Sequence, residues 1–240
     1  MDRYRFRLGI VIPLANEEHT IDTLLNRILI LTDGNDSIFC ITDNASSEAT
    51  RQKIKEYSIK HHRIHEVWAP ENRSVVDAYF CGYKEAIAKD CKWILEMDGG
   101  MSHNPNEIPK FIKAMEQGYD FAAGSRFIEN SNYSGISIRK IISRWGSILT
   151  NILLGTKMKD MTSGFECFSN KAMKHVLKQG VKSKAHFFQT EIRYNLRKWN
   201  YIEIPISYNN PSKRLASKNV FEALYILYQL FKKERLYYPK

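Results

Sequence analysis

Long hydrophobic runs are absent from this 240-residue sequence. No apolar stretch approaches the about 18 residues that a membrane-spanning helix needs. The arginine-bearing N-terminus leads directly into a short apolar run, without the hydrophobic core of a signal peptide. These absences argue against an integral membrane protein and predict a soluble or peripheral one.

Cysteine is scarce and is not arranged for disulfide or metal chemistry. Cys40, Cys81, Cys91 and Cys167 are scattered, show no C-x-x-C spacing and mostly lie among apolar neighbours. That distribution is typical of reduced thiols in the core of a cytosolic protein. We therefore expect a cytoplasmic protein without a disulfide or metal-thiolate framework.

Acidic residues are fewer than basic ones, with 26 Asp and Glu against 36 Lys and Arg and a formal net charge of +10. This excess favours an anionic partner, which could be nucleic acid, a nucleotide or an acidic membrane surface. No RNA- or DNA-binding signature accompanies the charge. Nucleic acid is therefore not predicted as a partner.

What the sequence does contain is a regular alternation of apolar runs and amphipathic segments. Strands separated by helices imply right-handed crossovers between parallel neighbours. The predicted fold class is α/β, a Rossmann-like, doubly wound, mostly parallel sheet with helices on both faces. The expected strands are residues 7–13, 37–42, 65–68, 93–97 and 119–124, and the expected helices are residues 20–31, a run capped by Ser46, and a run from Ser74 to Ala88.

Polar residues follow four of these strands at the point where each strand ends. They are Asn16-Glu17, Asp43-Asn44, Asn72-Arg73 and Asp98. In doubly wound sheets, ligands bind at the carboxyl ends of the strands, so we expect these tips to converge. Acidic and amide groups there could bind a base and ribose, while Arg73 could meet phosphate. The alternative for each tip taken singly is an ordinary turn.

The second half of the chain is less regular. Helical patterns cover residues 138–154, 171–178 and 188–199, and residues 201–207 predict a strand. A polar, glycine-bearing loop, Asp160 to Phe165, lies between the first two of these helices.

The last stretch, residues 219–240, contains a helix with an unusually wide apolar face beside Lys232, Lys233 and Arg235. Aromatic residues and cations on such a helix favour a position at a membrane surface. The chain would then lie at the cytoplasmic face of the membrane. The alternative is a helix packed on its own domain or on a dimer mate.

Taken together, the ordered motifs resemble those of family 2 glycosyltransferases. More narrowly, they are similar to those of the dolichyl- and polyprenyl-phosphate mannose synthases. The resemblance implies a GT-A fold, with a catalytic domain at residues 1–218, and an inverting transfer from a nucleotide-sugar that usually uses a divalent metal. The motifs that carry it are Ile10–Glu17, Asp43–Ser46, Glu71–Arg73, Met97–Pro105, Gly124–Arg126, Arg139 with Ser143, Asp160–Phe165 and Glu203–Ile206.

The resemblance assigns roles to individual residues. Asp98 matches the first Asp of the Asp-x-Asp metal motif, so it is expected to bind Mg²⁺ or Mn²⁺ on the donor diphosphate. The nucleotide-binding residues it implies are Pro13, Ala15, Asn16, Glu17, Asp43, Asn72, Arg73 and Asp98. The residues implied for the phosphates and the acceptor are Arg126, Arg139, Ser143, Arg214 and Lys218.

Three departures from the family pattern affect these expectations. Gly100 stands where the second Asp of the metal motif is expected, which should weaken a hard-cation site. Thr42 also replaces an expected Asp. The closing basic motif is altered, because Pro211 lies near the position of the usual Arg, and Arg214 is the candidate to take its place.

We therefore expect transfer of a sugar from a GDP- or UDP-linked donor to a polyprenyl phosphate, which is already ionised and needs no base. One alternative is a glycosyltransferase that acts on a sugar hydroxyl in surface polysaccharide synthesis. Such an enzyme needs a carboxylate base, for which Asp160 and Glu191 are the candidates. The other alternative, motivated by Gly100, is a nucleotide-sugar-binding protein that has lost activity.

Overall fold

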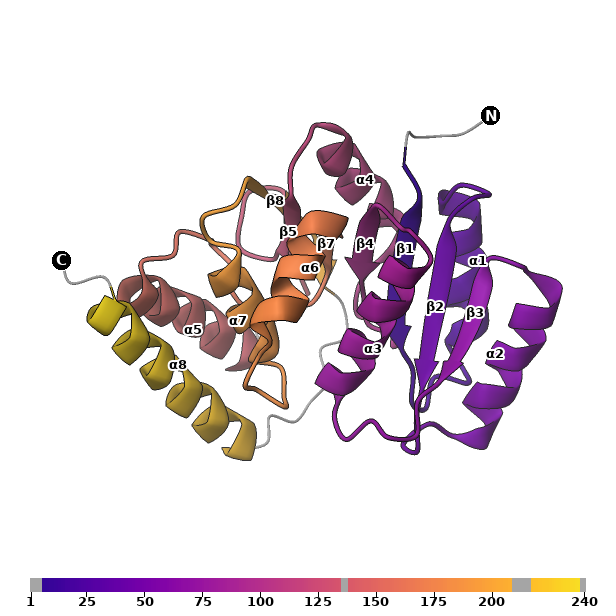
Figure 1. Ribbon diagram of the computed structural model, residues 1–240, viewed down its shortest axis with the longest axis horizontal. Coiled ribbons are helices and arrows are strands. Elements are labelled where there is room, and N and C mark those ends of the chain that lie inside the picture. The colour runs from indigo at the N-terminus through magenta and orange to yellow at the C-terminus, as the bar shows by residue number, and fades with distance from the viewer. Residues whose placement is uncertain (1–5, 135–137, 209–216, 238–240) are drawn as a thin grey trace.

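A seven-stranded sheet forms the centre of the protein. The computed structural model describes residues 6–134, 138–208 and 217–237. The strands lie in the order β3-β2-β1-β4-β7-β5-β8, so the first strand of the chain is near the middle (Figure 1). Their bounds are β1 Leu8–Pro13, β2 Ser37–Thr42, β3 Ile64–Trp68, β4 Trp93–Glu96, β5 Phe121–Ser125, β7 Glu166–Ser169 and β8 Tyr201–Pro205.

The sheet is mostly parallel, as the alternation of strands and helices predicts. β1 pairs with β2 and β4 in parallel, and β5 pairs with β8 in the same way. β7 is the exception, because it runs antiparallel to both of its neighbours, β4 and β5. This strand was not predicted, since it is only four residues long and begins with the charged Glu166.

Helices cover both faces of the sheet because its central strands are apolar on both sides. In β1, Ile10 and Ile12 pack with one hydrophobic cluster and Val11 packs with the other. The first cluster includes residues of α1 (Ile21–Leu31), α2 (Glu48–Lys60) and α4 (Ile108–Glu116). The second includes residues of α3 (Val75–Ala88), α6 (Asn170–Gln179) and α7 (Phe188–Asn195), which lie in front of the sheet in Figure 1.

Capping side chains fix where two of these helices begin. Ser74 accepts a hydrogen bond from the backbone N–H of Asp77 and so forms the predicted cap of α3. The predicted cap of α2 is wrong by one residue, because Ser47 accepts from Thr50 N while Ser46 donates to the carbonyl oxygen of Leu14 at 2.5 Å. Ser46 therefore joins the tips after β1 and β2, the first two polar tips of the sheet.

Two long helices form a layer at the end of the molecule remote from β3 (Figure 1). α5 (Ile138–Leu154) and α8 (Ser217–Tyr237) pack against each other, and Leu154, Ile226, Leu227 and Leu230 are buried between them and Tyr194. One face of α8 thus packs on its own domain, which is the alternative to a position at a membrane surface that the sequence left open. Within the described parts of the chain, neither this helix nor any other has the length and apolar character to cross a bilayer.

The remaining elements of the fold are short. β6 (Asn132–Tyr133) and β9 (Ser207–Tyr208) pair in a second, two-stranded sheet. The short 3-10 helix η1 (Pro105–Glu107) leads into α4, and Asn104 caps it by accepting from Asn106 N.

Candidate active site

A cavity of about 1010 Å³ opens at the carboxyl edge of the sheet. The strand-end loops line one part of it, and side chains of α5 and α8 line another. The predicted convergence of the polar tips is therefore observed in the fold. The lining residues from the strand ends include Pro13, Ala15, Glu17, Asp43, Asn72, Arg73, Asp98 and Arg126, and those from α5 and α8 include Ile142, Ser143, Leu149, Val220 and Leu224.

Asp98 follows β4 directly and is held by three neighbouring groups. Tyr79 Oη donates to one of its carboxylate oxygens at 3.0 Å, and Ser102 Oγ donates to the other at 3.0 Å. His103 Nδ1 accepts from the backbone N–H of Asp98. The Asp98 side chain keeps 42% of its surface exposed, so it is accessible to a ligand.

The surroundings of Asp98 favour its ionised form. Burial raises the pKa of the carboxyl. The nearby His103 and the hydrogen bonds from Ser102 and Tyr79 lower the pKa by more than burial raises it, so the net pKa lies below the ordinary value. The fixed charge is suited to a cation or to orienting a diphosphate. Tyr79 was not anticipated, because a tyrosine inside a helix carries no local signature of such a role.

The residues present fit a metal ion whose remaining ligands come from the substrate. Among the described residues, no group of three or more His, Cys, Asp and Glu side chains could hold an ion. Mg²⁺, however, is commonly bound by only one or two carboxylates together with substrate phosphates. Asp98 fits the role of that carboxylate, and a Cβ placed on Gly100 would meet nothing within 4 Å.

The loop after β1 presents part of its predicted set to the cavity. Pro13, Ala15 and Glu17 line it, whereas Asn16 is exposed and does not. The Glu17 carboxylate accepts from the backbone N–H of Ala15, and burial raises its pKa. The Glu17 carboxylate therefore binds the backbone of its own loop and fixes the conformation of that loop.

Asp43, Asn72 and Arg73 lie where the nucleotide is expected, because all three line the cavity. Asp43 accepts from the backbone N–H of Ala45 at 2.8 Å, which fixes the turn after β2. The side-chain nitrogen of Asn72 is buried and has no acceptor among the described residues. It can donate to an oxygen of a bound ligand.

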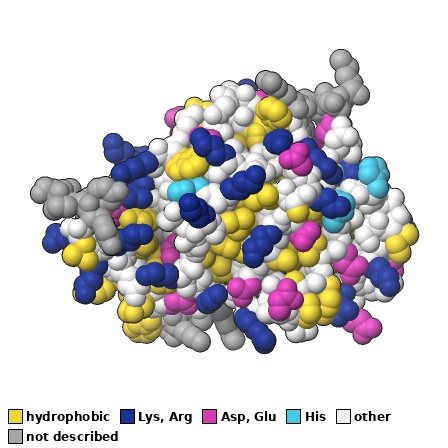
Figure 2. All heavy atoms as spheres, viewed as in Figure 1, with side chains coloured by type: hydrophobic (Ala, Val, Ile, Leu, Met, Phe, Trp, Pro, Cys, Tyr) yellow, Lys and Arg dark blue, Asp and Glu magenta, His cyan; other side chains and the backbone are white. Residues whose placement is uncertain are grey.

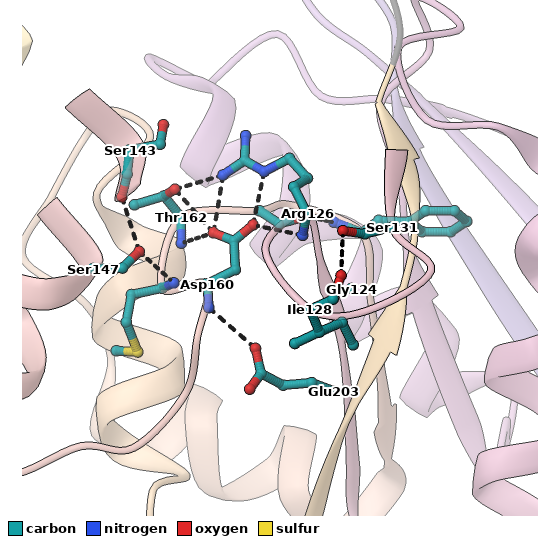
Figure 3. Close-up of polar contacts among 12 residues, drawn as sticks. Gly124, Arg126, Ile128, Ser131, Ser143, Ser147, Asp160, Thr162 and Glu203 are labelled. Atoms are coloured by element: carbon teal, nitrogen blue, oxygen red, sulfur yellow. Dashed lines mark hydrogen bonds and ion pairs between the residues drawn. The ribbon is translucent and has the colours of Figure 1, made fainter. Parts of the chain in front are cut away.

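Arg126 and Asp160 form a buried ion pair at the edge of the cavity (Figure 3). Arg126 donates from Nε at 2.7 Å and from Nη2 at 2.9 Å to the two carboxylate oxygens of Asp160, and Nη2 also donates to Thr162. Nη1 has no hydrogen-bond partner in the described part of the chain, and Arg126 lines the cavity. A phosphate oxygen there could accept from it.

The same geometry makes Asp160 a poor general base. Burial raises its pKa, but the guanidinium of Arg126 lowers it more, and the net pKa falls far below the ordinary range. Its backbone N–H donates to Glu203, so the loop is held on both sides (Figure 3). We infer that Asp160 orients Arg126.

Glu191, the other candidate base, is absent from the cavity lining. Its carboxylate accepts from the backbone N–H groups of Lys182 and Ser183 at 2.8–3.1 Å. The bonds favour a role in shaping the loop before α7.

The other predicted phosphate and acceptor residues are only partly covered. Ser143 lines the cavity on α5, and its carbonyl oxygen accepts from Ser147 Oγ (Figure 3). Arg139 and Lys218 belong to α5 and α8, but their side chains lie outside what the structure describes. Arg214 is outside the described residues altogether.

Three curated proteins are similar to this chain along most of its length. The polyprenol monophosphomannose synthase of Mycolicibacterium smegmatis is 21% identical, covering 91% of this chain and 84% of the relative. The undecaprenyl-phosphate mannosyltransferase of Micrococcus luteus is 23% identical, with coverages of 84% and 83%. The dolichol-phosphate mannosyltransferase of Pyrococcus furiosus is 26% identical over 95% of this chain, which spans 64% of that longer protein.

Solved structures confirm the GT-A fold. A glucosyl-3-phosphoglycerate synthase from Mycobacterium tuberculosis, in complex with Mn²⁺, uridine diphosphate and phosphoglyceric acid, superposes with a TM-score of 0.68. The match covers 94% of this chain and 78% of that one at 13% identity. The same enzyme with uridine diphosphate gives a TM-score of 0.70 at 12% identity.

The sequence profile named glycosyl transferase family 2 matches residues 9–177, which include the strand-end loops after β1, β2 and β4, and Arg126 and Asp160. With the fold and the strand-end site, this match shows that the chain belongs to glycosyltransferase family 2.

Proposed function

We propose that this glycosyltransferase moves a sugar, with inversion, from a GDP- or UDP-linked donor to a polyprenyl phosphate. The observation that carries the proposal is the composition of the cavity at the carboxyl edge of the sheet. One part is lined by Asp43, Asn72 and Asp98, and another by the apolar Ile142 and Leu224. A polar nucleotide-sugar and a lipid phosphate would meet in such a space.

The donor side supplies groups of the right chemistry. Asp43 and Asn72 offer an acceptor and a donor to a base or ribose, and Arg73 offers a cation to the diphosphate. Asp98 would hold the divalent ion. When bound, that ion would neutralise charge that develops on the departing diphosphate.

The acceptor side supports an anion rather than a neutral hydroxyl. A sugar hydroxyl needs a base, but the Asp160 carboxylate is bound by Arg126 and Glu191 is outside the cavity lining. A phosphate monoester carries about −1.5 to −2 charges at neutral pH and attacks without losing a proton. Within the described residues, Arg126 Nη1 has no hydrogen-bond partner, so it can donate to this phosphate.

The exposed faces of α5 and α8 support a lipid-bound acceptor. Trp145 is 67% exposed, Phe221 73% and Tyr225 63%, beside the cavity-lining Ile142 and Leu224. Figure 2 shows hydrophobic side chains among Lys and Arg over α8, at the lower left. This mixture suits a membrane surface, with both helices as its contact. The three curated relatives, by their names, act on polyprenol, undecaprenyl phosphate and dolichol phosphate.

The test is a panel of labelled nucleotide-sugars offered with either a short polyprenyl phosphate or an oligosaccharide, with and without Mg²⁺ or Mn²⁺. We expect label in the lipid, dependent on the metal. Asp98→Asn protein serves as the control for contaminating activity. Label in the oligosaccharide alone would refute the lipid acceptor, and donor binding without any product would favour a protein that has lost activity.

A further inference from the structure

A fully buried arginine lies beneath the site. Arg193, on α7, is 0% exposed and does not line the cavity. Its Nε donates to the carboxylate of Glu166, and its Nη1 donates to the carbonyl oxygen of Asp160. Its Nη2 donates to the carbonyl oxygens of Gly124 at 3.1 Å and Ser163 at 3.0 Å.

These contacts join the segments that carry the Arg126–Asp160 pair. Gly124 is in β5, two residues before Arg126, and Asp160 is itself the partner of Arg126. One side chain therefore holds the backbone on both sides of that ion pair. A shift of Arg193 would move the Arg126 guanidinium relative to the cavity.

Two neighbours on α7 hold the same loop. Thr190 Oγ1 donates to the carbonyl oxygen of Met161 at 2.8 Å. A Cβ built on Gly164 would overlap the side-chain nitrogen of Gln189, so the loop passes directly against the helix. This face of α7, made of Gln189, Thr190 and Arg193, supports the loop at 160–164 from one end to the other.

The choice of arginine argues for this geometric role. Burying a guanidinium has a large desolvation cost, which an apolar residue of similar volume avoids. Only a planar fork with several donors can reach one carboxylate and three carbonyl oxygens at once. A lysine at position 193 would keep the charge beside Glu166 but could not make all four bonds.

We propose that Arg193 is a positioning residue for transfer, which acts on the acceptor phosphate through Arg126 and Asp160 without touching it. The inference rests on the proposed function, in which Arg126 binds that phosphate.

The test separates positioning from stability. A paired variant, Arg193→Met with Glu166→Leu, replaces both charges of the buried ion pair. Because neither charge is left without its partner, the protein should still fold. We expect kcat/KM for the acceptor to fall about 100-fold, as for a displaced catalytic group, with donor affinity unchanged. Arg193→Lys, which keeps the charge, should show a smaller loss. Full acceptor activity in the paired variant would overturn the inference.

A double-mutant cycle identifies the route of the effect. If Arg193 acts through Arg126, the paired change should alter acceptor kinetics by less than about 2-fold in an Arg126→Ala background. An undiminished loss in that background would overturn the inference. Arg63→Met is the matched control, because Arg63 also donates to carbonyl oxygens, of Leu29 and Asp33, but does not line the cavity.

Calorimetric binding of a short-chain prenyl phosphate distinguishes this inference from the proposed function. If Arg126→Ala does not weaken binding, the proposed acceptor site is wrong. If Arg126→Ala weakens binding and the paired Arg193 variant does not, the inference about Arg193 is wrong. Weakening by both, without further loss when they are combined, supports both.

Discussion

Asp98 is the residue on which transfer should depend most. Replacing it with Asn keeps the shape but removes the charge that Tyr79 and Ser102 now orient. We expect Asp98→Asn to lower kcat/KM by at least about 100-fold, because the lost interaction acts mainly in the transition state. Steady-state kinetics with saturating metal would measure it. Activity within a few-fold of the wild type would remove Asp98 from the site.

Gly100 should tolerate a carboxylate. Nothing lies within 4 Å of a Cβ built at this position, and its backbone does not adopt the left-handed conformation. Gly100→Asp would give the ion a second carboxylate, so we expect the metal concentration for half-maximal activity to fall. Metal binding by calorimetry, without substrate, would show the same change. Gly34→Asp is the control, since Gly34 is also uncrowded but lies outside the cavity lining.

Asp160 should matter for stability in a pH-dependent way. Asp160→Asn leaves the buried Arg126 without its counter-ion, which should cost about 3–5 kcal/mol at neutral pH. The folded pKa of Asp160 is depressed, so its contribution is present above the ordinary pKa of about 4 and is lost as the pH falls toward the folded value.

Urea unfolding of both proteins at several pH values would measure this difference. The gap in free energy of unfolding should therefore narrow below about pH 4. A gap that stays constant or widens on acidification would contradict the ion-pair explanation.

At the scale of helices, the apolar face of α5 and α8 can be tested without disturbing the core. Removing α8 would uncover Leu154 and Tyr194, so substitutions of exposed residues are sharper. Phe221→Ser should weaken vesicle binding about 10-fold, because a buried Phe side chain is worth about 1.5–3 kcal/mol.

Sedimentation with vesicles containing anionic lipid would measure it. Ile59→Ser is the control, since Ile59 is 77% exposed but lies on α2. Equal binding by the wild type and Phe221→Ser would argue for a different use of this face.

Sequence patterns predicted the strands in which neighbouring residues are apolar and buried in the same way. β1 and the centre of β2, Ile38 to Ile41, are apolar runs, and helices bury both of their faces. β7 was missed because Glu166, which looks like a loop residue, is buried by pairing with Arg193 from a distant helix. Periodicity contains no information about a charge whose partner is 27 residues away.

The residues of the site were also predictable only in part. The strand-end loops were predictable because topology alone brings them together, as Asp43 and Asp98 show. Tyr79 and Arg193 were not, because their roles depend on which way a helix faces the sheet. Glu191 was proposed as a base from its residue type, and only the fold reveals that it binds backbone N–H groups.

At the scale of the whole molecule, the cavity lies between two structural regions. The sheet and its strand-end loops supply charged lining residues such as Asp43, Arg73 and Asp98, and the layer of α5 and α8 supplies apolar ones such as Ile142 and Leu224. The two regions are linked by hydrogen bonds, since Ser147 on α5 accepts from Met161 N in the Asp160 loop. A donor arriving from water and an acceptor arriving from a membrane would approach the cavity from different sides.

The distribution of thiols in the fold also provides a route to site-specific labelling. Cys40, Cys91 and Cys167 are buried, whereas Cys81 on α3 is only partly so. Burial raises the pKa of Cys81 as well, so a mild alkylating reagent should react slowly but with preference for this thiol. A fluorophore there would sit two residues from Tyr79, which donates to Asp98. The native chain, without any engineered cysteine, could in this way report donor binding by a change in emission.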